Sequence, residues 1–521
     1  MSINYSNLDN SKSFKGLVDA PVPSIKKELN PERIGKYSTP AGAGLTYNFA
    51  GKKVNSEILG LLQNLADEQQ LTEKYTSLLN GDIVNTGEKR MVLHHHCRGM
   101  KINDLVVDGQ DMTEFYNTEK KKIYDFASKV HGKEIVGSTG KPFNTVVQVG
   151  IGGSDLGPRA IYLALKNAVT PKMTAKFISN VDPDDANNTL ADLDFETTLF
   201  VLVSKSGTTQ ETLTNQKFVL EKMAQSSIKG LNPLKHFVCV TSAQSPLAAD
   251  TNYLASFFID NNIGGRFSST SAVGGCVLTL ALGSDAFDRF LEGAKEADKQ
   301  ALNPNIYENA ALLDALIGVY ENNILGMKNT AVIPYSESMS RFPAHLQQLD
   351  MESNGKSVNR DGKAISYATG PSIFGEPGTN SQHSFFQFIH QATSIIPLQF
   401  IGFRKPQIDA DIEFQGSTSG KKLNANLVAQ MTAMGLGKDD DNKNKYFAGE
   451  RPTSLLHADK LTPEIMGAIL AHFENKVMFQ GFTWNINSFD QEGVQLGKLL
   501  ADKVLNNQMD DILKAYAGIM I

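Results

Sequence analysis

Six consecutive residues have the composition of a phosphate-binding turn. Residues 204–209 read Ser-Lys-Ser-Gly-Thr-Thr, and they supply four hydroxyls and one ammonium where an apolar strand should turn into a helix. Backbone N–H groups at a helix N-terminus lack intrahelical partners and carry a partial positive charge, which suits a phosphate dianion. Thr208 and Glu211 have the spacing of a capping box. An ordinary Ser/Thr-rich connection that binds nothing would have a similar composition, because both residue types favour helix N-termini.

Glycine-rich turns flank this hexamer in the sequence. Residues 150–157 read Gly-Ile-Gly-Gly-Ser-Asp-Leu-Gly, and Asp155 stands where a dinucleotide fingerprint needs its third glycine. A compact turn that lets backbone approach a small ligand is the better interpretation, with a simple tight connection as the alternative. Arg266 follows two glycines and precedes hydroxyl residues; its permanently charged, weakly hydrated guanidinium suits an oxyanion in a dry site. A surface arginine after a turn is disfavoured by the apolar stretch 272–275.

Two carboxylic acids lie in the polar stretch 347–356. Asp350 and Glu352 are two positions apart, so on a helix they would not share a face. One of them can serve as a base while the other has a structural part. Spacing alone, however, favours a solvated loop for this stretch.

A histidine and a lysine complete the acid–base inventory. Residues 375–383 form a turn-rich segment that ends in His383, and residues 488–498 form a short turn-plus-helix unit that ends in Lys498. Gln491 precedes Lys498 by seven positions, about two helical turns, so both side chains can face one pocket. Taken alone, Lys498 would be interpreted as a solvated surface lysine.

Metal binding is disfavoured for the histidines of this chain. His383 and His390 are seven positions apart, but no third ligand accompanies them at metal spacing. The run His94-His95-His96 places neighbouring side chains in different directions, so one ion rarely collects all three. Neither set of histidines therefore favours a metal site.

Composition predicts a protein of several domains that works in the cytoplasm. A chain of 521 residues suggests about two to four domains. Its net charge of −6 argues against nucleic acid or an anionic membrane as the general partner. No apolar run approaches the ~18 residues of a membrane span, and the first 14 residues lack the apolar core of a signal peptide. Three cysteines without paired spacing are expected to be reduced thiols, at positions 97, 239 and 276.

The expected elements alternate between short apolar strands and helices. Strands are predicted at 145–149, 176–178, 199–203 and 237–240, and a second set at 331–334 and 398–402. Helices are predicted at 55–69, at 158–167, across 284–325 and from about 494 onward. Short apolar runs that alternate with helices indicate parallel sheets covered on both faces. No convincing repeat relates the two sets, and the first ~100 residues show helical patterning without strong strands.

Seven segments together resemble the glucose-6-phosphate isomerase family, and they stand in that family's order from about residue 30 to the end of the chain. They are GIGGSDLGP at 150–158, SKSGTTQET at 204–212, GGRFS at 264–268, QQLDMESNGK at 347–356, GEPGTNSQHSFFQ at 375–387, GERPTS at 449–454 and FDQEGVQLGK at 489–498. Each segment alone is moderate evidence, but seven in order are highly specific.

The resemblance implies an α/β fold of two sugar-isomerase (SIS) domains, each a three-layer αβα sandwich around a parallel sheet. We assign an N-terminal helical segment packing on the larger domain to residues 1–110, the first SIS domain to 111–285, the second to 286–505 and a C-terminal helix to 506–521. The resemblance also implies a homodimer in which His383 acts across the subunit interface. The expected partner is a hexose 6-phosphate, with no nucleic acid and no membrane, and the reaction that the resemblance implies calls for no metal or organic cofactor.

The resemblance further assigns roles for the reversible conversion of glucose 6-phosphate to fructose 6-phosphate. Histidine titrates near neutral pH and suits ring opening, a role that matches His383 with Lys498 as its assistant. Glu352 matches the base that moves the carbon proton, and Arg266 is suited to stabilise the enediolate. The remaining matches hold the substrate: Ser204, Lys205, Ser206 and Thr209 at the phosphate, Gly153 and Ser154 near the sugar, and Gly265, Gln348 and Gln491 as positioning residues.

Several positions depart from the common family pattern. The phosphate segment often reads SKTFTT, so Gly207 replaces an aromatic residue, and we expect a loop that is more mobile before ligand arrives. Glu492 and Gln495 replace a usual tryptophan and glutamate. The run 94–96 occupies a place where a mostly apolar strand is usual. We expect these changes to affect local packing more than catalysis.

Two rival functions remain to be weighed. A non-catalytic sugar-phosphate-binding SIS protein would keep residues 204–209 but would not need Glu352, His383 and Lys498 together. An NAD(P)-dependent oxidoreductase is disfavoured by the missing fingerprint spacing. Turnover in a coupled assay without added metal distinguishes the isomerase from both.

Overall fold

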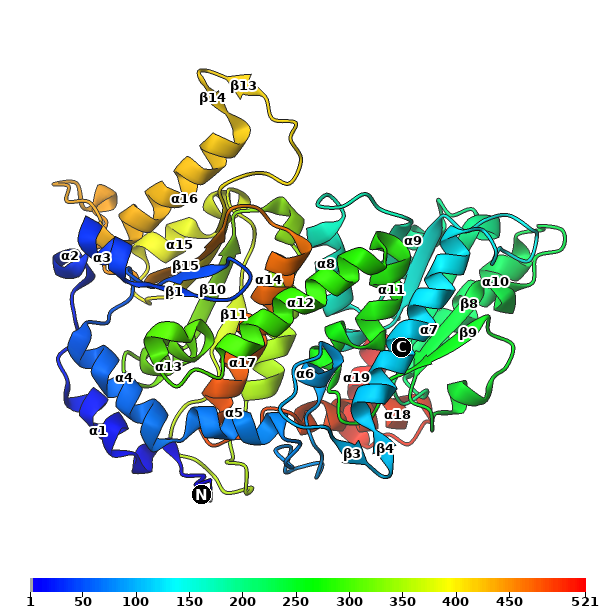
Figure 1. Cartoon of the computed structure of the whole chain (residues 1–521), viewed down its shortest axis with the longest axis horizontal. Coiled ribbons are helices and arrows are strands. Elements are labelled where there is room, and N and C mark those ends of the chain that lie inside the picture. Colours follow the sequence, from blue (N-terminus) through cyan, green and yellow to red (C-terminus); the bar gives the residue numbers. More distant parts are fainter. Residues whose placement is uncertain (1–2) are drawn as a thin grey trace.

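Two β-sheets, each covered by helices on both faces, form the framework of the molecule (Figure 1). The structure is a computed structural model and describes residues 3–521. The first sheet is entirely parallel and has the order β6-β5-β7-β8-β9. Its strands are β5 (Thr145–Val149), β6 (Thr174–Ile178), β7 (Thr198–Val203), β8 (Phe237–Thr241) and β9 (Ala255–Phe258). The four strands predicted for this part of the chain are confirmed, and β9 was not predicted.

Alternating side chains of the first sheet enter two different cores. Leu199, Val201 and Val203 of β7 belong to the large core on the side of α11 (Ala272–Leu282). Phe200 and Leu202 belong to a second core together with α9 (Pro183–Leu190) and α10 (Gln210–Gln225). Because successive strand residues point to opposite faces, a strand between two helical layers is apolar throughout. All six residues of β7 are buried accordingly.

The second sheet is mixed and has the order β1-β2-β15-β12-β10-β11. Its parallel part comprises β10 (Asn329–Pro334), β11 (Ser372–Phe374), β12 (Leu398–Phe403) and β15 (Thr453–Ala458), which confirms the two predicted strands. Two three-residue strands near the N-terminus, β1 (Ser38–Pro40) and β2 (Thr46–Asn48), extend this sheet, and β2 runs antiparallel to β15. The first 110 residues are therefore not purely helical. Strands this short carry too little local pattern to be predicted.

The other elements surround the two sheets. The N-terminal part contains α1 (Lys12–Asp19), α2 (Ile25–Glu28), α3 (Pro31–Lys36), α4 (Ser56–Glu68), α5 (Leu71–Leu79), α6 (His94–Cys97), the small hairpin β3 (Val106–Val107) and β4 (Gln110–Asp111), and α7 (Met112–His131). Helix α8 (Leu156–Leu165) follows β5. The second sheet is accompanied by α14 (Phe342–Leu346), α15 (Phe386–Gln391) and α16 (Ser419–Leu436).

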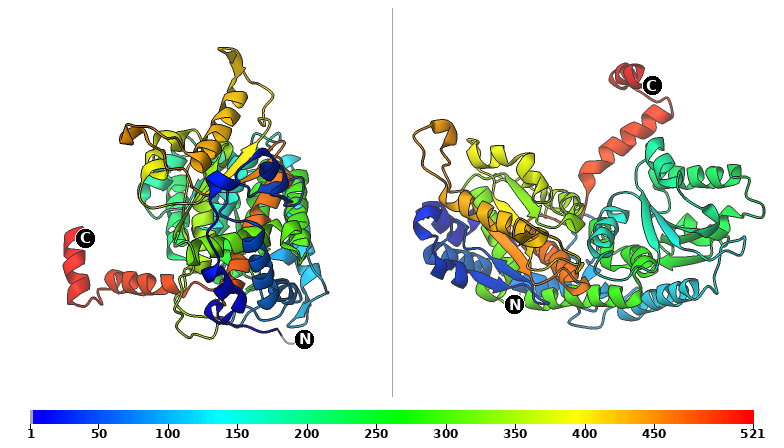
Figure 2. Two further views of the ribbon diagram at one scale, coloured as in Figure 1. Left: turned by 90° about the vertical axis from the view of Figure 1, so that its left-hand side faces the viewer. Right: turned by 90° about the horizontal axis from the view of Figure 1, so that it is seen from above.

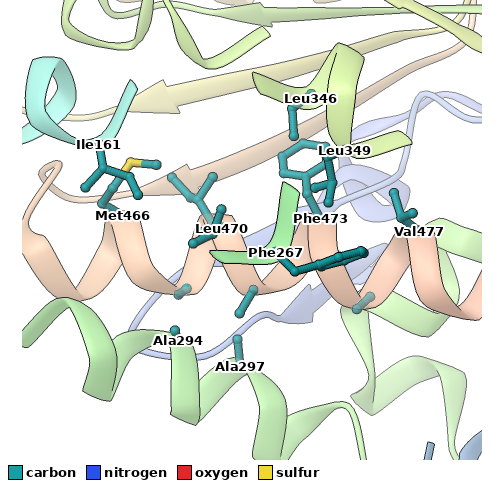
Figure 3. Packing of buried hydrophobic residues seen from close by; sticks show 14 of the residues in the cluster. Ile161, Phe267, Ala294, Ala297, Leu346, Leu349, Met466, Leu470, Phe473 and Val477 are labelled. Carbon is teal, nitrogen blue, oxygen red and sulfur yellow. The ribbon is translucent and has the colours of Figure 1, made fainter. Parts of the chain in front are cut away.

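A long buried helix, α17 (Pro463–Thr483), passes through the middle of the molecule and packs on α12 (Ser284–Gln300) and α13 (Ala310–Asn323). Ala294 and Ala297 of α12 face it, while its larger side chains point away toward α8 and α14 (Figure 3). A Cβ on Gly467 would lie 1.9 Å from a backbone oxygen of α12, so only glycine permits this approach. Both helices contribute to the large hydrophobic core, which also contains residues of both sheets.

Buried charges on α17 are paired with charges from distant parts of the chain. Asp314 of α13 accepts from His472 (Nε2, 3.0 Å) and lies 3.1 Å from the Lys476 ammonium. Burial alone would raise the pKa of Asp314, but Lys476 and His472 hold it well below its ordinary value. Buried ionic groups require such partners because an unpaired charge inside a protein is costly.

Two parts of the chain extend from the body of the molecule. The C-terminal helices α18 (Gln495–Leu505) and α19 (Asp511–Met520) have no buried residue and project outward (Figure 2). Helix α16, with the small hairpin of β13 (Glu413–Phe414) and β14 (Ser417–Thr418), projects on another side (Figure 1). Within residues 3–521, no helix is both long and apolar enough to cross a membrane.

Candidate functional site

A cavity of about 300 Å³ brings together twelve of the thirteen predicted site residues. It lies beyond the carboxyl ends of β5 and β7, where parallel α/β sheets commonly bind ligands. The turns η2 (Gly152–Ser154) and η6 (Gly265–Thr270), the helical segment η9 (Gln347–Glu352) and the start of the C-terminal extension complete its wall. The twelve residues are Gly153, Ser154, Ser204, Lys205, Ser206, Thr209, Gly265, Arg266, Gln348, Glu352, Gln491 and Lys498.

Residues 204–209 form a compact polar turn between β7 and α10. Ser204 Oγ lies 2.9 Å from Thr209 Oγ1 and accepts the Gly207 N–H at 3.1 Å. Lys205 Nζ donates to the Ile263 carbonyl at 2.9 Å. Burial, together with the nearby Arg90, lowers the pKa of Lys205. A partly desolvated ammonium beside free helix N–H groups is well placed to receive a phosphate dianion.

The predicted capping box at this helix is wrong. Helix α10 begins at Gln210, its N-cap is Thr209, and no side chain caps it. The Thr208 hydroxyl instead donates to Ser206 Oγ at 3.0 Å. The helix therefore starts one residue later than the box requires, which leaves the N–H groups of its first turn without a side-chain acceptor.

Gly207 is explained by the backbone of the turn. Its φ is +69°, a left-handed conformation that residues with a Cβ rarely adopt. A Cβ at this position would also lie 2.7 Å from Ser245 Oγ. In this conformation the turn has no room for the aromatic residue that is common at this position in the family.

Two glycines let the backbone of η2 touch the backbone of η6. A Cβ on Gly153 would lie 2.1 Å from the Gly265 carbonyl oxygen and 2.8 Å from the Arg266 nitrogen. Gln148 on β5 supports the same turn, because its Nε2 donates to the Ser154 carbonyl at 2.6 Å. These glycines thus allow two backbone turns to touch, which fixes where Arg266 enters the cavity, whereas the sequence predicted a close approach of the backbone to a small ligand.

Glu352 and Arg266 form an ion pair in the cavity wall, with Arg266 Nη1 3.4 Å from Glu352 Oε2. The guanidinium is 1% exposed. It donates to Ser353 Oγ (2.6 Å), the Ser488 carbonyl (2.6 Å) and Gln491 Oε1 (3.2 Å). Burial lowers the pKa of Arg266, while Glu352 acts in the opposite direction. With so many acceptors, Arg266 is held in one orientation and stays charged.

The two acids of residues 347–356 have different environments. Segment η9 is a π-helix, a rare form that occurs often at functional sites. The Glu352 side chain is 21% exposed and lines the cavity, whereas Asp350 is buried and burial raises its pKa to about 7. The expectation of a solvated loop is therefore wrong, because packing against α17 and β11 makes this stretch helical.

Gln348 and Lys498 line the cavity with polar atoms that have no protein partner in the described structure. Gln348 Oε1 is buried and unpaired, and a sugar hydroxyl is a suitable donor for it. Lys498 lies on α18 and is exposed, although it lines the same cavity as Gln491.

His383 is the one predicted residue that the structure leaves out of the cavity. It ends the turn η10 (Asn380–His383) on the second-sheet side, and its side chain is exposed. Within residues 3–521, no histidine lines the 300 Å³ cavity. A single chain therefore supplies the carboxylate, the guanidinium and the lysine, but no imidazole.

The run His94-His95-His96 is buried in a short helix instead of a strand. His94 stacks on Phe267 with ring centroids 4.6 Å apart, and His95 Nε2 lies 3.0 Å from Asn475 Oδ1. Burial lowers the pKa of His95 to about 4. His94 thus packs against the residue that follows Arg266 in the sequence. The other two departures, Glu492 and Gln495, are exposed.

Some residues of the site were not predicted from the sequence. Asn85 and Glu88 of the N-terminal segment line the cavity, and Ser353 contacts Arg266. Ser353 adjoins Glu352 in the same polar stretch, which was a usable signal. Nothing in the sequence links positions 85 and 88 to a phosphate turn more than 100 residues later. A larger cavity of about 760 Å³ adjoins the first and shares Gln348 and Glu352 with it.

Comparison with known proteins identifies a consistent set of relatives. The family model described as phosphoglucose isomerase matches residues 48–516. The glucose-6-phosphate isomerase of Treponema denticola is 58% identical over 99% of this chain and 100% of its own length. That of Borreliella burgdorferi is 46% identical over 99% of this chain and 98% of its own length. A crystal structure of a glucose-6-phosphate isomerase from Chlamydia trachomatis superimposes with a TM-score of 0.93 at 42% identity, covering 99% of both chains.

Proposed function

The chain belongs to the phosphoglucose isomerase family, and from that premise we propose how its cavity carries out the reaction. It is an enzyme that reversibly isomerises glucose 6-phosphate and fructose 6-phosphate, a step of glycolysis and gluconeogenesis. The reaction opens the sugar ring and moves a proton between C1 and C2 through an enediolate. The observation that carries the proposed roles is the convergence of a phosphate-type turn with the Glu352–Arg266 pair in one cavity.

The phosphate is held by residues 204–209 and the N-terminus of α10. The Lys205 ammonium supplies charge, and Ser204, Ser206 and Thr209 supply hydroxyl donors. This end of the substrate does not react. Its binding energy places C1 and C2 at a fixed distance from the turn, beside η2 and η9, which converts the proton transfer into a step between prepositioned groups.

Glu352 is the base that removes the C2 proton of the open-chain aldose and returns it to C1. Such a group typically contributes about 10²- to 10⁴-fold to the rate. Arg266, 3.4 Å from this carboxylate, lies where negative charge develops on the enediolate oxygens. Its other donors are occupied by fixed acceptors, so the cation need not reorganise as the charge develops.

Ring opening needs a group that exchanges a proton with the ring oxygen and the C1 hydroxyl. We assign this role to His383, with Lys498 as its assistant. Because His383 is exposed and lies outside its own chain's cavity, the proposal places it in the site of a second copy. Imidazole suits proton exchange near neutral pH.

A symmetric homodimer would supply that second copy. The C-terminal helices support the proposal, because they have no buried residue yet carry exposed apolar side chains. The large apolar side chains exposed on these two helices are Leu496, Leu499, Leu505, Ile512, Tyr516, Ile519 and Met520. Amphipathic helices that pack on nothing in one chain are typical of interfaces between chains.

Two further assignments rest on the same proposal. We propose that the enzyme acts in the cytoplasm on a hexose 6-phosphate. We also keep the division at residues 110, 285 and 505 as a proposed domain organisation. The catalytic assignment, and not the sugar-phosphate-binding alternative, is the one that relatives over the full chain support.

Activity is tested by coupling the conversion of fructose 6-phosphate to the oxidation of glucose 6-phosphate, with a chelator present. Turnover should persist when the chelator is present. A protein that shows no turnover in this assay would refute the isomerase assignment. The role of Glu352 is tested by Glu352→Gln, which should abolish exchange of the C2 proton with solvent while inorganic phosphate still competes for the site. Gln keeps the shape of the side chain, so retained exchange would exclude Glu352 as the base.

A further inference from the structure

Lys356 is the last residue of the polar stretch 347–356, and Asp490 lies near the start of the stretch 488–498. The proposed mechanism gives neither residue a role. Their side chains meet beside the cavity, with Lys356 Nζ 2.6 Å from Asp490 Oδ1. Both side chains are 15% exposed, so the pair is largely removed from water. The same ammonium donates to the Asp490 backbone carbonyl at 3.0 Å.

Asp490 is held from three sides. Its second carboxylate oxygen accepts from Asn487 Nδ2 at 2.6 Å, and a Cβ on Gly87 would lie 2.5 Å from that oxygen. Its carbonyl accepts from Arg266 Nη2 at 3.0 Å in addition to Lys356. Two cations, one of them proposed to stabilise the enediolate, therefore converge on one residue, and its carboxylate offsets their repulsion.

The backbone of Lys356 is itself held by hydrogen bonds. Its backbone N–H donates to the Asn354 carbonyl (2.9 Å) and to Thr369 Oγ1 (3.3 Å), and the Thr369 hydroxyl donates to the Lys356 carbonyl at 2.6 Å. Lys356 is also four residues after Glu352. The ion pair thus ties the loop of residues 487–491 to the same short segment that carries the proposed base.

Beyond this loop, the hydrogen bonds of η12 and α18 are local, and within residues 3–521 none joins these two elements to a distant segment. Neither η12 (Glu492–Val494) nor α18 has a buried residue, yet both Gln491 and Lys498 line the cavity. The direction of α18, and with it the position of Lys498, is set by how residues 487–491 are held. A misplacement of about 1 Å at a catalytic group can cost about 100-fold in rate.

We propose that the Lys356–Asp490 ion pair is a clasp that positions Gln491, Lys498 and the Arg266 guanidinium for catalysis. Lys356 and Asp490 are positioning residues, since they act through these groups and not on the substrate. The proposal rests on the roles proposed above for Arg266 and Lys498. It leaves phosphate binding to residues 204–209, none of which is a hydrogen-bond partner of Lys356 or Asp490.

The test compares Lys356→Met and Asp490→Asn, which remove one charge with little change of shape, with the parent enzyme. Each should lower kcat about 10- to 100-fold while the inhibition constant of inorganic phosphate stays within about twofold. Lys356→Arg, which keeps the charge, should retain most of the activity. Lys121→Met is the matched control, because Lys121 forms an exposed ion pair with Asp125 on α7, and it should leave kcat unchanged.

Hydrogen exchange followed by mass spectrometry reads the clasp without relying on activity. In Lys356→Met, peptides within residues 488–505 should exchange faster, and peptides of the two sheets should not. This readout also separates the clasp from the proposed roles: if Lys498→Met has full activity, the role of Lys498 fails, while faster exchange still supports the clasp.

Two results would overturn the proposal. The first is a kcat within twofold of the parent in both Lys356→Met and Asp490→Asn. The second is a loss of kcat that Lys356→Arg shares, accompanied by faster exchange over the whole chain, which would indicate a general structural role. Asp490→Asn retains the side-chain volume and hydrogen-bonding atoms. If Lys356→Met does not fold, kcat and hydrogen exchange are therefore measured in Asp490→Asn, with the same results expected.

Discussion

Two inactive variants should restore activity to one another when they share a dimer. Glu352→Gln removes the proposed base, and His383→Ala removes the proposed ring-opening group. His383 is exposed and does not line the cavity of its own chain, whereas Glu352 does. If His383 enters the partner's site, a dimer with one copy of each variant contains one site with both defects and one site with neither.

The expected magnitudes follow from this count of sites. Each pure variant should be about 10²- to 10⁴-fold less active than the parent, the usual contribution of one acid–base group. The mixed dimer should have roughly half the parent's kcat per dimer, because one of the two sites of a symmetric dimer is intact. If both groups acted within one chain, each site of the mixed dimer would carry one defect, and activity would stay at the level of the pure variants.

The assay needs mixed dimers free of the parent enzyme. The two variants, carrying different affinity tags, are co-expressed and purified over both columns, and turnover is measured in the coupled assay. Co-expressed pairs of the same variant serve as controls for contamination. Activity of the mixed dimer no higher than that of these controls would refute the placement of His383 across an interface.

Three further predictions concern the phosphate turn and the core. Gly207→Ala should raise KM roughly 5- to 30-fold, because a left-handed φ costs about 1–2 kcal/mol and the new Cβ would lie 2.7 Å from Ser245 Oγ; unchanged steady-state kinetics would contradict this. Because burial lowers the pKa of Lys205, its ammonium should lose its proton at a lower pH than that of an ordinary lysine, and the affinity for inorganic phosphate should fall there. Lys205→Arg keeps its charge and should remove this loss of affinity at alkaline pH. Asp298→Ala should lower the free energy of unfolding by about 3–5 kcal/mol, since Asp298 accepts from the buried Arg98 (Nη2, 2.7 Å); denaturant titration measures it, and a loss below about 1 kcal/mol would exclude a net contribution from the pair.

Much of the site could be predicted because its information is local. The run from β7 into α10 is readable from apolar residues followed by hydroxyls and glycine, since strand burial and helix starts depend on near neighbours. The same holds for the glycines of η2, where a missing Cβ is itself the signal. The roles of Glu352, Arg266 and Lys498 came from the resemblance. Spacing alone favoured a solvated loop around Glu352 and an ordinary surface lysine at Lys498.

Tertiary structure decided everything that depends on which distant segments meet. Ser204 and Lys498 are about 300 positions apart and share a cavity only because the turns after β5 and β7, η9 and the C-terminal segment converge there. The exclusion of His383 from that cavity, the burial of His94-His95-His96 and the meeting of Lys356 with Asp490 leave no trace in local pattern. Propensity and periodicity report a residue's own element, whereas side-chain partners are set by packing between elements. The sequence by itself thus determined the chemistry available to this protein, and only the fold determined which groups can act on one substrate.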